Sequence, residues 1–378
     1  MRHLASAILA VVVMAIAPFA AGASPQEPPP GPLEPRIAQD VLQALDALPA
    51  GERLPVIVTF QEQADLRPGG LAGRSERQEH VVGVLRRTAQ ATQAPFRAML
   101  ARQRLVGDVD RVTYFWIFNG LAVTATPDVI LELASRPEVR SVTLDRAFSA
   151  PNPSATAAAQ SVSPVEQNVL LINAPPLWDL GFQGQGIVVA NMDTGVSVSH
   201  PDLGARWRGG TNSWFDPYGE HPSSPVDLNG HGTATMGIMV GGDAGGTAIG
   251  VAPLAQWIAV KIFDDRGQAT TSAIHLGFQW LLDPDGDPST PDAPHVVNNS
   301  WRIGDAECDL AFQLDLQALR AAGIVPVFSA GNTGPADATS VSPANNPEAL
   351  AVGATDKSDL IYAGSARGPS SCGESATI

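Results

Sequence analysis

Two short runs in the sequence contain residue types that can move protons. Asp193 begins the run DTG, and His231, 38 positions later, begins the run HGT. A carboxylate that orients an imidazole, which then takes a proton from a serine hydroxyl, is the arrangement of Ser-His-Asp hydrolases. Asp193 and His231 therefore match two of the three members of such a constellation.

The surroundings of both residues favour this role. Asp193 directly follows the apolar run 187–192. Open parallel sheets place functional groups at the carboxyl ends of their strands. His231 follows Asn229 and Gly230 and opens an apolar stretch whose small neighbours let the ring face a cleft. A single histidine is more often structural, so the pairing with Asp193 is what favours catalysis.

A DTG run also marks the carboxylates of aspartic proteases, which use a different chemistry. Those enzymes need two such runs, or a dimer, because two carboxylates share one proton. The sequence has one DTG run. The aspartic interpretation is therefore the weaker alternative.

A third candidate is Asn332, which follows the apolar run 324–329 and Gly331. A side-chain amide at the end of a strand and beside a cleft can donate an N–H to the oxyanion of a tetrahedral intermediate. The alternative is an ordinary turn asparagine ahead of the Thr-Gly-Pro at 333–335. The neighbouring motifs favour the oxyanion role.

The second part of the chain alternates short apolar runs with helical stretches. The runs are mostly apolar on both faces, as the strands of a covered parallel sheet are. This pattern predicts an α/β fold, a three-layer parallel-sheet domain with right-handed crossovers. The predicted strands are 187–192, 257–263, 295–299, 324–329 and 349–353, and the predicted helices are 231–240, 273–282 and 310–322.

The first part has a different order of elements. It reads strand, helix, strand, strand, helix, strand, with a hairpin that turns at Asn119-Gly120. This order is typical of a small α+β ferredoxin-like domain. The predicted ranges are 56–60, 77–104, 112–125, 127–136 and 139–144.

Composition divides the chain into five segments. The first 23 residues have a short basic start, an apolar run and an Ala-Gly-Ala site, which is typical of a secretory signal. Pro18 cuts the apolar run short of the roughly 20 residues that a membrane span needs, so we expect a secreted, extracellular product without a stable membrane anchor in this segment. The segments are 1–23 (signal peptide), 24–51 (Pro-rich spacer), 52–146 (first domain), 147–164 (exposed linker) and 165–378 (second domain).

The net charge of −15 lies entirely in the second part of the chain. Residues 1–150 have 15 Arg and 15 acidic residues, whereas residues 151–378 have 8 basic and 23 acidic residues. Phosphates would repel an acidic exported domain, which argues against nucleic acids and anionic membranes as partners.

Five motifs follow one another along the second part of the chain. They are MDTG at 192–195, NGHGT at 229–233, GVAP at 250–253, APHVVNNSW at 293–301 and AGN at 330–332. Taken together and in this order, they resemble the motifs of subtilisin-like serine proteases, and the longest run is similar to enzymes of the bacillopeptidase F type. The resemblance covers about residues 165–372. Residues 52–146 resemble the family's inhibitory propeptide more loosely.

This resemblance implies a secreted serine endopeptidase, made as a zymogen, whose own propeptide is an intramolecular inhibitor. Its substrates would be extended polypeptides, cleaved by an Asp-His-Ser triad that requires no cofactor. Asp193 and His231 would take the triad roles, and Asn332 would stabilise the oxyanion.

The resemblance also implies the substrate-binding residues. Ser300 and Trp301 would lie on the strand that pairs with the substrate, and Ala330 and Gly331 would line the pocket opposite. The family's commoner Ser-Leu-Gly reads Ser-Trp-Arg at 300–302, so the preferred substrate side chain is left open.

The nucleophile of this constellation is missing from the sequence. In the family the order along the chain is Asp, His, Ser, yet no serine after His231 stands in a Gly-Thr-Ser-x-Ala-x-Pro setting. We therefore expect the serine to lie beyond Ile378 and the chain as given to be truncated and inactive. The alternative is a pseudoprotease that only binds. The late serines, all in loop-like runs, are Ser365, Ser370, Ser371 and Ser375.

Two further features have structural interpretations. Cys308 and Cys372 are the only cysteines, and in an oxidising compartment they could pair with each other or with a cysteine elsewhere. The run DPDGD at 283–287 resembles the opening of a calcium loop, but it lacks the later bidentate Glu of an EF-hand. A structural calcium ion and a solvated acidic turn are the two alternatives for this run.

Overall fold

The structure, a computed structural model, describes residues 36–67, 73–152 and 163–373. The predicted signal peptide, the first residues of the predicted spacer and most of the predicted linker lie outside these residues.

The first domain is a four-stranded antiparallel sheet with helices on it. The strand order β2-β3-β1-β4 is that of a ferredoxin-like fold. Each element lies within a few residues of its predicted range. The elements are β1 (Leu54–Phe60), α2 (Arg74–Leu105), β2 (Val109–Phe115), β3 (Gly120–Ala125), α3 (Pro127–Ser135) and β4 (Val139–Leu144).

Ordered structure begins earlier than the sequence predicts. Helix α1 (Gln39–Ala47) lies inside the segment predicted as a spacer. Its Val41 is fully buried in the core of the antiparallel sheet, and Leu45 packs against the same core. The i, i+4 spacing of these two residues is helical. The Pro-rich composition of the segment before the helix hid this short amphipathic stretch.

The second domain is a six-stranded parallel sheet in the order β12-β11-β10-β6-β8-β7. Five of its strands match predicted runs, and the two-residue β7 is too short to give a sequence signal. The strands are β6 (Val188–Asp193), β7 (Trp214–Phe215), β8 (Gln256–Lys261), β10 (Val296–Asn299), β11 (Val325–Ser329) and β12 (Leu350–Val352).

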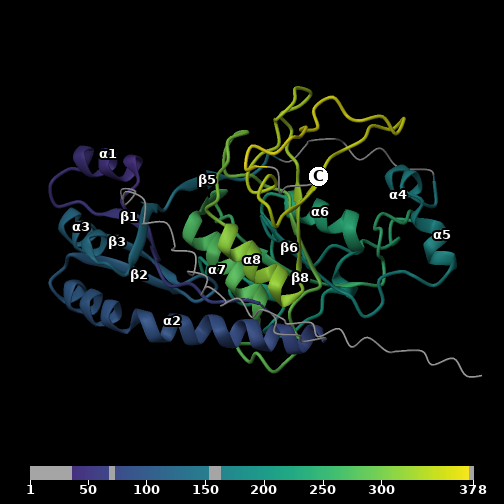
Figure 1. The fold of residues 1–378 in the computed structure, drawn as a ribbon. Coiled ribbons are helices and arrows are strands. Elements are labelled where there is room, and N and C mark those ends of the chain that lie inside the picture. The colour runs from purple at the N-terminus through teal and green to yellow at the C-terminus, as the bar shows by residue number, and fades with distance from the viewer. Residues whose placement is uncertain (1–35, 68–72, 153–162, 374–378) are drawn as a thin grey trace, which may run out of the picture. The chain divides into compact units, whose positions relative to one another are not determined.

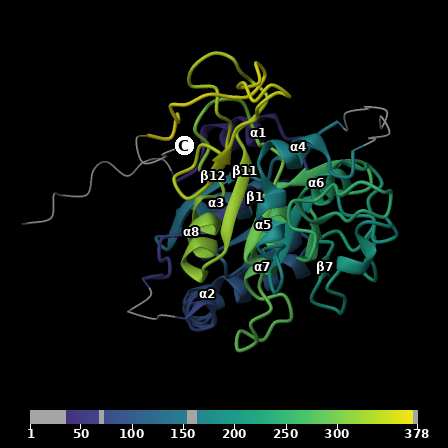
Figure 2. The same cartoon turned by 90° about the vertical axis from the view of Figure 1, so that its right-hand side faces the viewer.

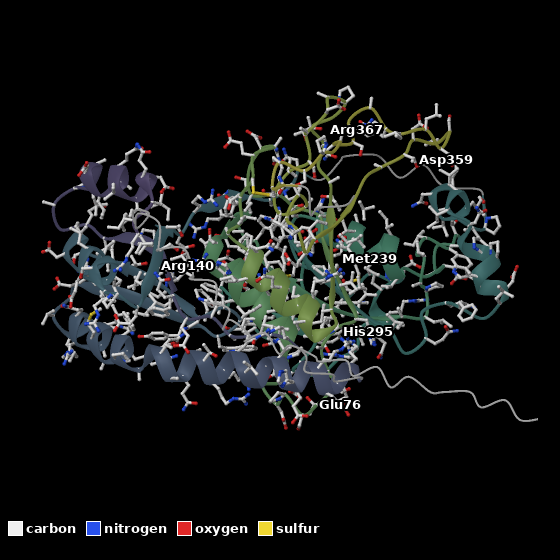
Figure 3. All side chains as sticks on the ribbon, viewed as in Figure 1. Glu76, Arg140, Met239, His295, Asp359 and Arg367 are labelled. Atoms are coloured by element: carbon white, nitrogen blue, oxygen red, sulfur yellow. A yellow bond between two sulfur atoms is a disulfide. The ribbon has the colours of Figure 1, made fainter. Side chains whose placement is uncertain are left out.

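Alternate residues of β8 show why this sheet needs helices on both faces. Ile258 and Val260 pack in the cluster that contains α7 and α8, whereas Trp257 and Ala259 pack with α6. Met239 belongs to the α6 side (Figure 3). Helices α6 and α8 lie on opposite sides of the sheet (Figure 2), which gives the three predicted layers. The helices are α6 (His231–Val240), α7 (Thr271–Leu282) and α8 (Gln313–Ala322).

The two domains share a hydrophobic core. Helix α2 runs beneath β2 and α8 (Figure 1). The rings of Phe118 and His275 lie 4.5 Å apart, and the rings of His275 and Phe312 lie 4.9 Å apart. One face of the antiparallel sheet therefore packs on α7 and α8, while its other face has a separate core with α1 and α3.

The remaining elements are short. Strands β5 (Ala147–Ser149) and β9 (Gln268–Thr270) pair antiparallel and join the two domains. Helices α4 (Gln167–Leu171) and α5 (Ala174–Asp179) precede β6, and a 3-10 turn (Gly204–Arg206) follows it. In the part of the chain that the structure describes, no helix is long and apolar enough to cross a membrane.

Cys308 and Cys372 form a disulfide, with Cα atoms 4.9 Å apart. The bond joins the loop after β10 to the last described segment. Of the two pairings left open by the sequence, the structure has the internal one.

Candidate active site

Asp193 and His231 lie in direct contact. Asp193 is the last residue of β6, and its side chain is completely buried. His231 is the first residue of α6, and its ring is 20% exposed. Nδ1 of His231 lies 2.8 Å from Oδ1 and 3.0 Å from Oδ2 of Asp193. Because an ionised carboxylate can only accept, Nδ1–H donates and Nε2 is left as the basic nitrogen.

Two glycines allow this contact. Gly195 has φ +111°, and a Cβ there would lie 1.9 Å from the carbonyl oxygen of Val226. A Cβ on Gly232 would lie 2.1 Å from the carbonyl oxygen of Gly195 and 3.1 Å from Cβ of Asp193. Any larger residue at either position would push the end of β6 away from the start of α6.

Asp227, which the sequence analysis did not single out, organises the start of α6. Its Oδ1 accepts from the backbone N–H groups of Asn229 (3.0 Å) and Gly230 (2.8 Å) and from Oγ1 of Thr194 (2.9 Å). Its Oδ2 accepts from the backbone N–H and the hydroxyl of Thr233. The carboxylate thus satisfies free N–H groups at a helix start. An acidic residue just ahead of Asn-Gly and an apolar helix was the available signal.

A second missed group is the amide of Asn191 in β6. Its Nδ2 donates to the carbonyl oxygen of Gly232 (3.0 Å), and its Oδ1 accepts from Nδ2 of Asn298 (2.9 Å). Asn298 also donates to Oγ of Ser300 (3.0 Å). These bonds connect the turn after His231 to the strand end that carries Ser300. Their only sequence signal is polar residues within apolar runs.

A cleft brings most of the other predicted residues beside His231. Ser300, Trp301, Gly331 and Asn332 all line it. Ala330 is buried (4% exposed), and its backbone bonds to Val341 and Val352. The structure therefore puts Gly331 and Asn332 at the cleft surface and Ala330 behind them.

Trp301 packs mostly into the core of the second domain. Its ring lies 5.6 Å from that of Phe328 and 5.9 Å from that of Phe312, and the residue is only 3% exposed. The exposed Arg302 lines the cleft and pairs with Asp305, with Nη1 3.0 Å from Oδ1. The larger residue at position 301 thus fills the core rather than the cleft.

The amide of Asn332 is available to a ligand. It is exposed at the cleft, and none of the described residues hydrogen-bonds its side chain. Gly331 before it has φ +114°, and a Cβ there would lie 2.9 Å from the side chain of Val341. The left-handed glycine therefore turns the chain so that Asn332 leaves the end of β11 beside His231.

The late serines are engaged elsewhere in the described structure. Oγ of Ser370 donates to the carbonyl oxygen of Asn345 (2.6 Å), and Oγ of Ser371 accepts from the amide of Asn345 (3.0 Å). Ser365 is buried and accepts from the N–H of Ala354. Ser375 lies outside the described residues. No described residue hydrogen-bonds Nε2 of His231.

The charges around His231 favour its imidazolium form. Burial of the ring by itself would lower the pKa of His231, but the hydrogen bond and charge of Asp193, together with the charge of Asp227, outweigh burial and raise it. Such a pair suits a base that must hold a proton transiently during a reaction.

Comparisons with known proteins agree with this geometry. A profile of the Subtilase family matches residues 184–377. The chain belongs to the subtilase family. It is 37% identical over 326 residues to Bacillopeptidase F of Bacillus subtilis (strain 168), over 79% of this chain. It is 29% identical to the minor extracellular protease Vpr of the same strain, over 80% of this chain, and 30% identical to its Subtilisin E, over 65%.

The matched part is a fraction of each relative. It covers 22% of Bacillopeptidase F, 36% of Vpr and 58% of Subtilisin E. The family match confirms the predicted subtilisin-like parallel-sheet fold and the resemblance to the bacillopeptidase F type. Subtilases need no cofactor for the chemical step, since the triad itself supplies the nucleophile and the base.

We expect Gly232→Ala to destabilise this subtilase, because its Cβ would meet the backbone of Gly195. The free energy of unfolding should fall by about 3 kcal/mol, as for overpacked cores, and urea denaturation of the 378-residue chain measures it. Gly245→Ala is the matched control, because nothing lies within 4 Å of a Cβ there. Equal stability of the two variants would contradict the close approach.

We expect the pKa of His231 to lie above the ordinary value of about 6.5. A raised folded-state pKa means that this pair stabilises the fold fully below the unfolded pKa and loses that contribution as pH rises through the folded pKa. Asp193→Asn should lower the pKa, because only the smaller effect of the Asp227 charge would then oppose burial, while Asp110→Asn at an exposed position of β2 should not. NMR titration of the ring signals measures the pKa of His231 in the wild type and in both variants. An unchanged pKa in Asp193→Asn would refute the assignment of Asp193 as the partner of His231.

Proposed function

We propose that this subtilase sequence is part of a secreted serine endopeptidase that is made as a zymogen. The observation that carries the proposal is the pair formed by the buried Asp193 and His231, beside a cleft that also holds the free amide of Asn332. The similar protein Vpr is named as an extracellular protease, which supports export. The predicted signal peptide at 1–23 supports it from the sequence.

The proposed chemistry is acyl transfer. Nε2 of His231 takes the proton from a serine hydroxyl while the serine oxygen attacks the peptide carbonyl carbon. Asp193 stabilises the imidazolium that forms, and the amide of Asn332 donates to the oxyanion. His231 then gives the proton to the leaving amine, and water resolves the acyl-enzyme by the same route. We propose that the serine lies on a segment beyond residue 378, so that residues 1–378 alone do not catalyse.

An extended polypeptide is the substrate that the cleft suits. The backbone of residues 300–302 continues from the end of β10, and Gly331 faces it across the cleft. Pairing with backbone groups binds a strand regardless of most of its side chains. The enzyme would therefore cleave polypeptides of many sequences, and the pocket walls would set its preference among substrate side chains.

The described part of residues 36–152 is proposed to act as the propeptide. Strand β5 pairs with β9, and residues 149–152, from the last residue of β5 onward, line the same cleft as His231 and Asn332. The chain leading out of the first domain thus lies where a substrate would lie. We propose that it blocks the cleft until the segment after it is cut.

The side chain of Gln279 makes one of the polar contacts between the first domain and the second. Oε1 of Gln279 on α7 accepts from the backbone N–H groups of Trp116 (2.6 Å) and Ile117 (3.2 Å), in the turn after β2. Both residues lie just beyond the end of β2, and neither N–H group donates to a backbone oxygen of the described residues. Gln279 therefore fixes the tip of that sheet against the second domain.

For the proposed activity, we expect the gene product that carries the downstream serine to hydrolyse casein and to react with a fluorophosphonate. His231→Ala should reduce kcat by about 10⁴-fold or more, and Asn332→Ala by about 10²–10³-fold. His200→Ala, in the second domain and outside the cleft, is the control. Residues 1–378 alone should show no hydrolysis. A serine-free product that binds peptides would favour a pseudoprotease, and hydrolysis by His231→Ala would contradict the proposal.

For the proposed propeptide, we expect residues 36–152 to inhibit the mature enzyme at about micromolar concentration or below. Gln279→Ala in the enzyme should weaken this inhibition about tenfold, because two N–H groups lose their acceptor. Gln317→Ala on α8 is the matched control, since no described residue hydrogen-bonds its side chain. Inhibition constants from peptide hydrolysis decide, and no inhibition of the wild type would count against the propeptide role.

A further inference from the structure

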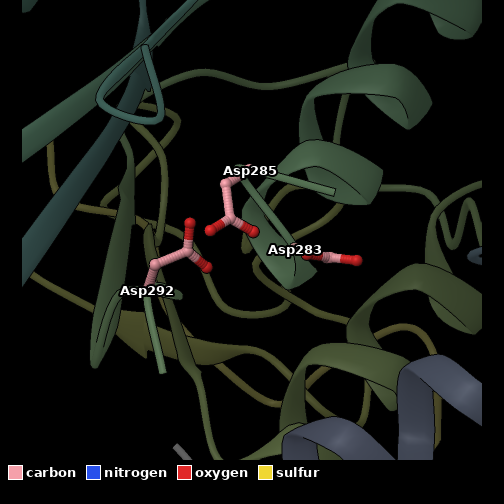
Figure 4. A group of neighbouring side chains, drawn as sticks. All are labelled: Asp283, Asp285 and Asp292. Carbon is pink, nitrogen blue, oxygen red and sulfur yellow. The ribbon is translucent and has the colours of Figure 1, made fainter. Parts of the chain in front are cut away.

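We propose that Asp283, Asp285 and Asp292 form a binding site for a hard divalent cation, Ca²⁺, at the end of α7. One carboxylate oxygen from each residue lies within 4.8 Å of the others (Figure 4). Ca²⁺ holds oxygens at about 2.4 Å, so two of its ligands lie at most about 4.8 Å apart. These residues are not in the cleft, and the inference is independent of proteolysis.

The acidic run 283–287, which the sequence offered as a possible calcium loop, contains only part of this group. It contains Asp283 and Asp285, but its third aspartate, Asp287, is not among the three clustered residues. Asp292 takes that place from the far end of the loop. Oδ1 of Asp285 accepts from the N–H of Asp287 and Oδ2 from the hydroxyl of Thr290, which hold the Asp285 side chain in position.

Asp283 distinguishes this group from an ordinary acidic turn. Its side chain is completely buried. Its Oδ1 has no partner among the described residues, and the contact of its Oδ2 is the ion pair with Arg86. Oδ1 of Asp292 is also buried without a partner. Buried carboxylate oxygens without donors are costly. A bound cation would satisfy them, which a solvated surface cluster would not need.

Among the residues that the structure describes, the one charged group in contact with the Asp283 carboxylate comes from the proposed propeptide. Nη2 of Arg86 on α2 lies 2.5 Å from Oδ2 of Asp283, and Nη1 donates to the carbonyl oxygen of Gly286 (3.1 Å). Arg208 of the second domain instead donates to the backbone oxygen of Asp292. Arg86 therefore supplies a positive charge where the cation would bind, and should compete with it.

The test is calorimetric titration of CaCl₂ into the EDTA-treated 378-residue chain. Arg86→Gln should bind Ca²⁺ about tenfold more tightly than the wild type, because a competing charge is removed. Arg87→Gln, its exposed neighbour on α2, is the matched control and should equal the wild type. MgCl₂ should bind more weakly, since Mg²⁺ demands shorter and more regular coordination.

Carboxylate variants identify the ligands. In the Arg86→Gln background, Asp283→Asn and Asp285→Asn should each weaken Ca²⁺ binding about tenfold or more, and Asp287→Asn should leave it unchanged. The exposed Asp285 keeps the test valid if Asp283→Asn does not fold. No Ca²⁺ binding by Arg86→Gln at millimolar concentration would overturn the site. Equal losses in Asp287→Asn and Asp285→Asn would overturn the ligand assignment. Neither result depends on catalytic activity.

Discussion

The structure around the cleft depends on one buried carboxylate. Asp193 has no contact with solvent, so its charge must be compensated by donors inside the protein. The backbone N–H of Thr194 (2.7 Å) and the ring of His231 supply that compensation. Since the carboxylate is fixed by the end of β6, the imidazole can occupy only one orientation, with Nε2 toward the cleft. The position of α6 follows from this requirement.

The sequence predicted Asp193, His231 and Asn332 because each follows or opens an apolar run, and the ends of parallel strands meet at one sheet edge. Asp227 and Asn191 could not be found in this way. Their roles depend on hydrogen bonds to groups from other segments, such as the hydroxyl of Thr194 and the carbonyl of Gly232. Local patterns contain no information about such partners.

For the fold too, local sequence patterns predicted the strands that are covered on both faces but not the strands that depend on contacts between the domains. Strands covered on both faces give continuous apolar runs, and β8, with Trp257 and Val260 buried on opposite faces, is an example. Strands β5 and β9 have three residues each and no alternation that stands out. They exist because the docked first domain brings residues 147–149 beside 268–270, a tertiary effect that overrides weak local propensity.

The first domain has two kinds of buried surface, and the difference bears on its proposed release. One face of its sheet packs in a core made only of residues from the first domain, around Phe60 and Phe96, whose ring centroids lie 4.5 Å apart. The other face, with Phe115 and Phe118, belongs to the core that the first domain shares with α7 and α8. This separate core allows the first domain to remain folded after it leaves the second domain, whereas its shared face would then expose aromatic surface to water. Separation is therefore unfavourable by itself, and cutting the connecting chain is not sufficient to keep the cleft open. A domain with this surface should stay bound after cleavage until it is degraded.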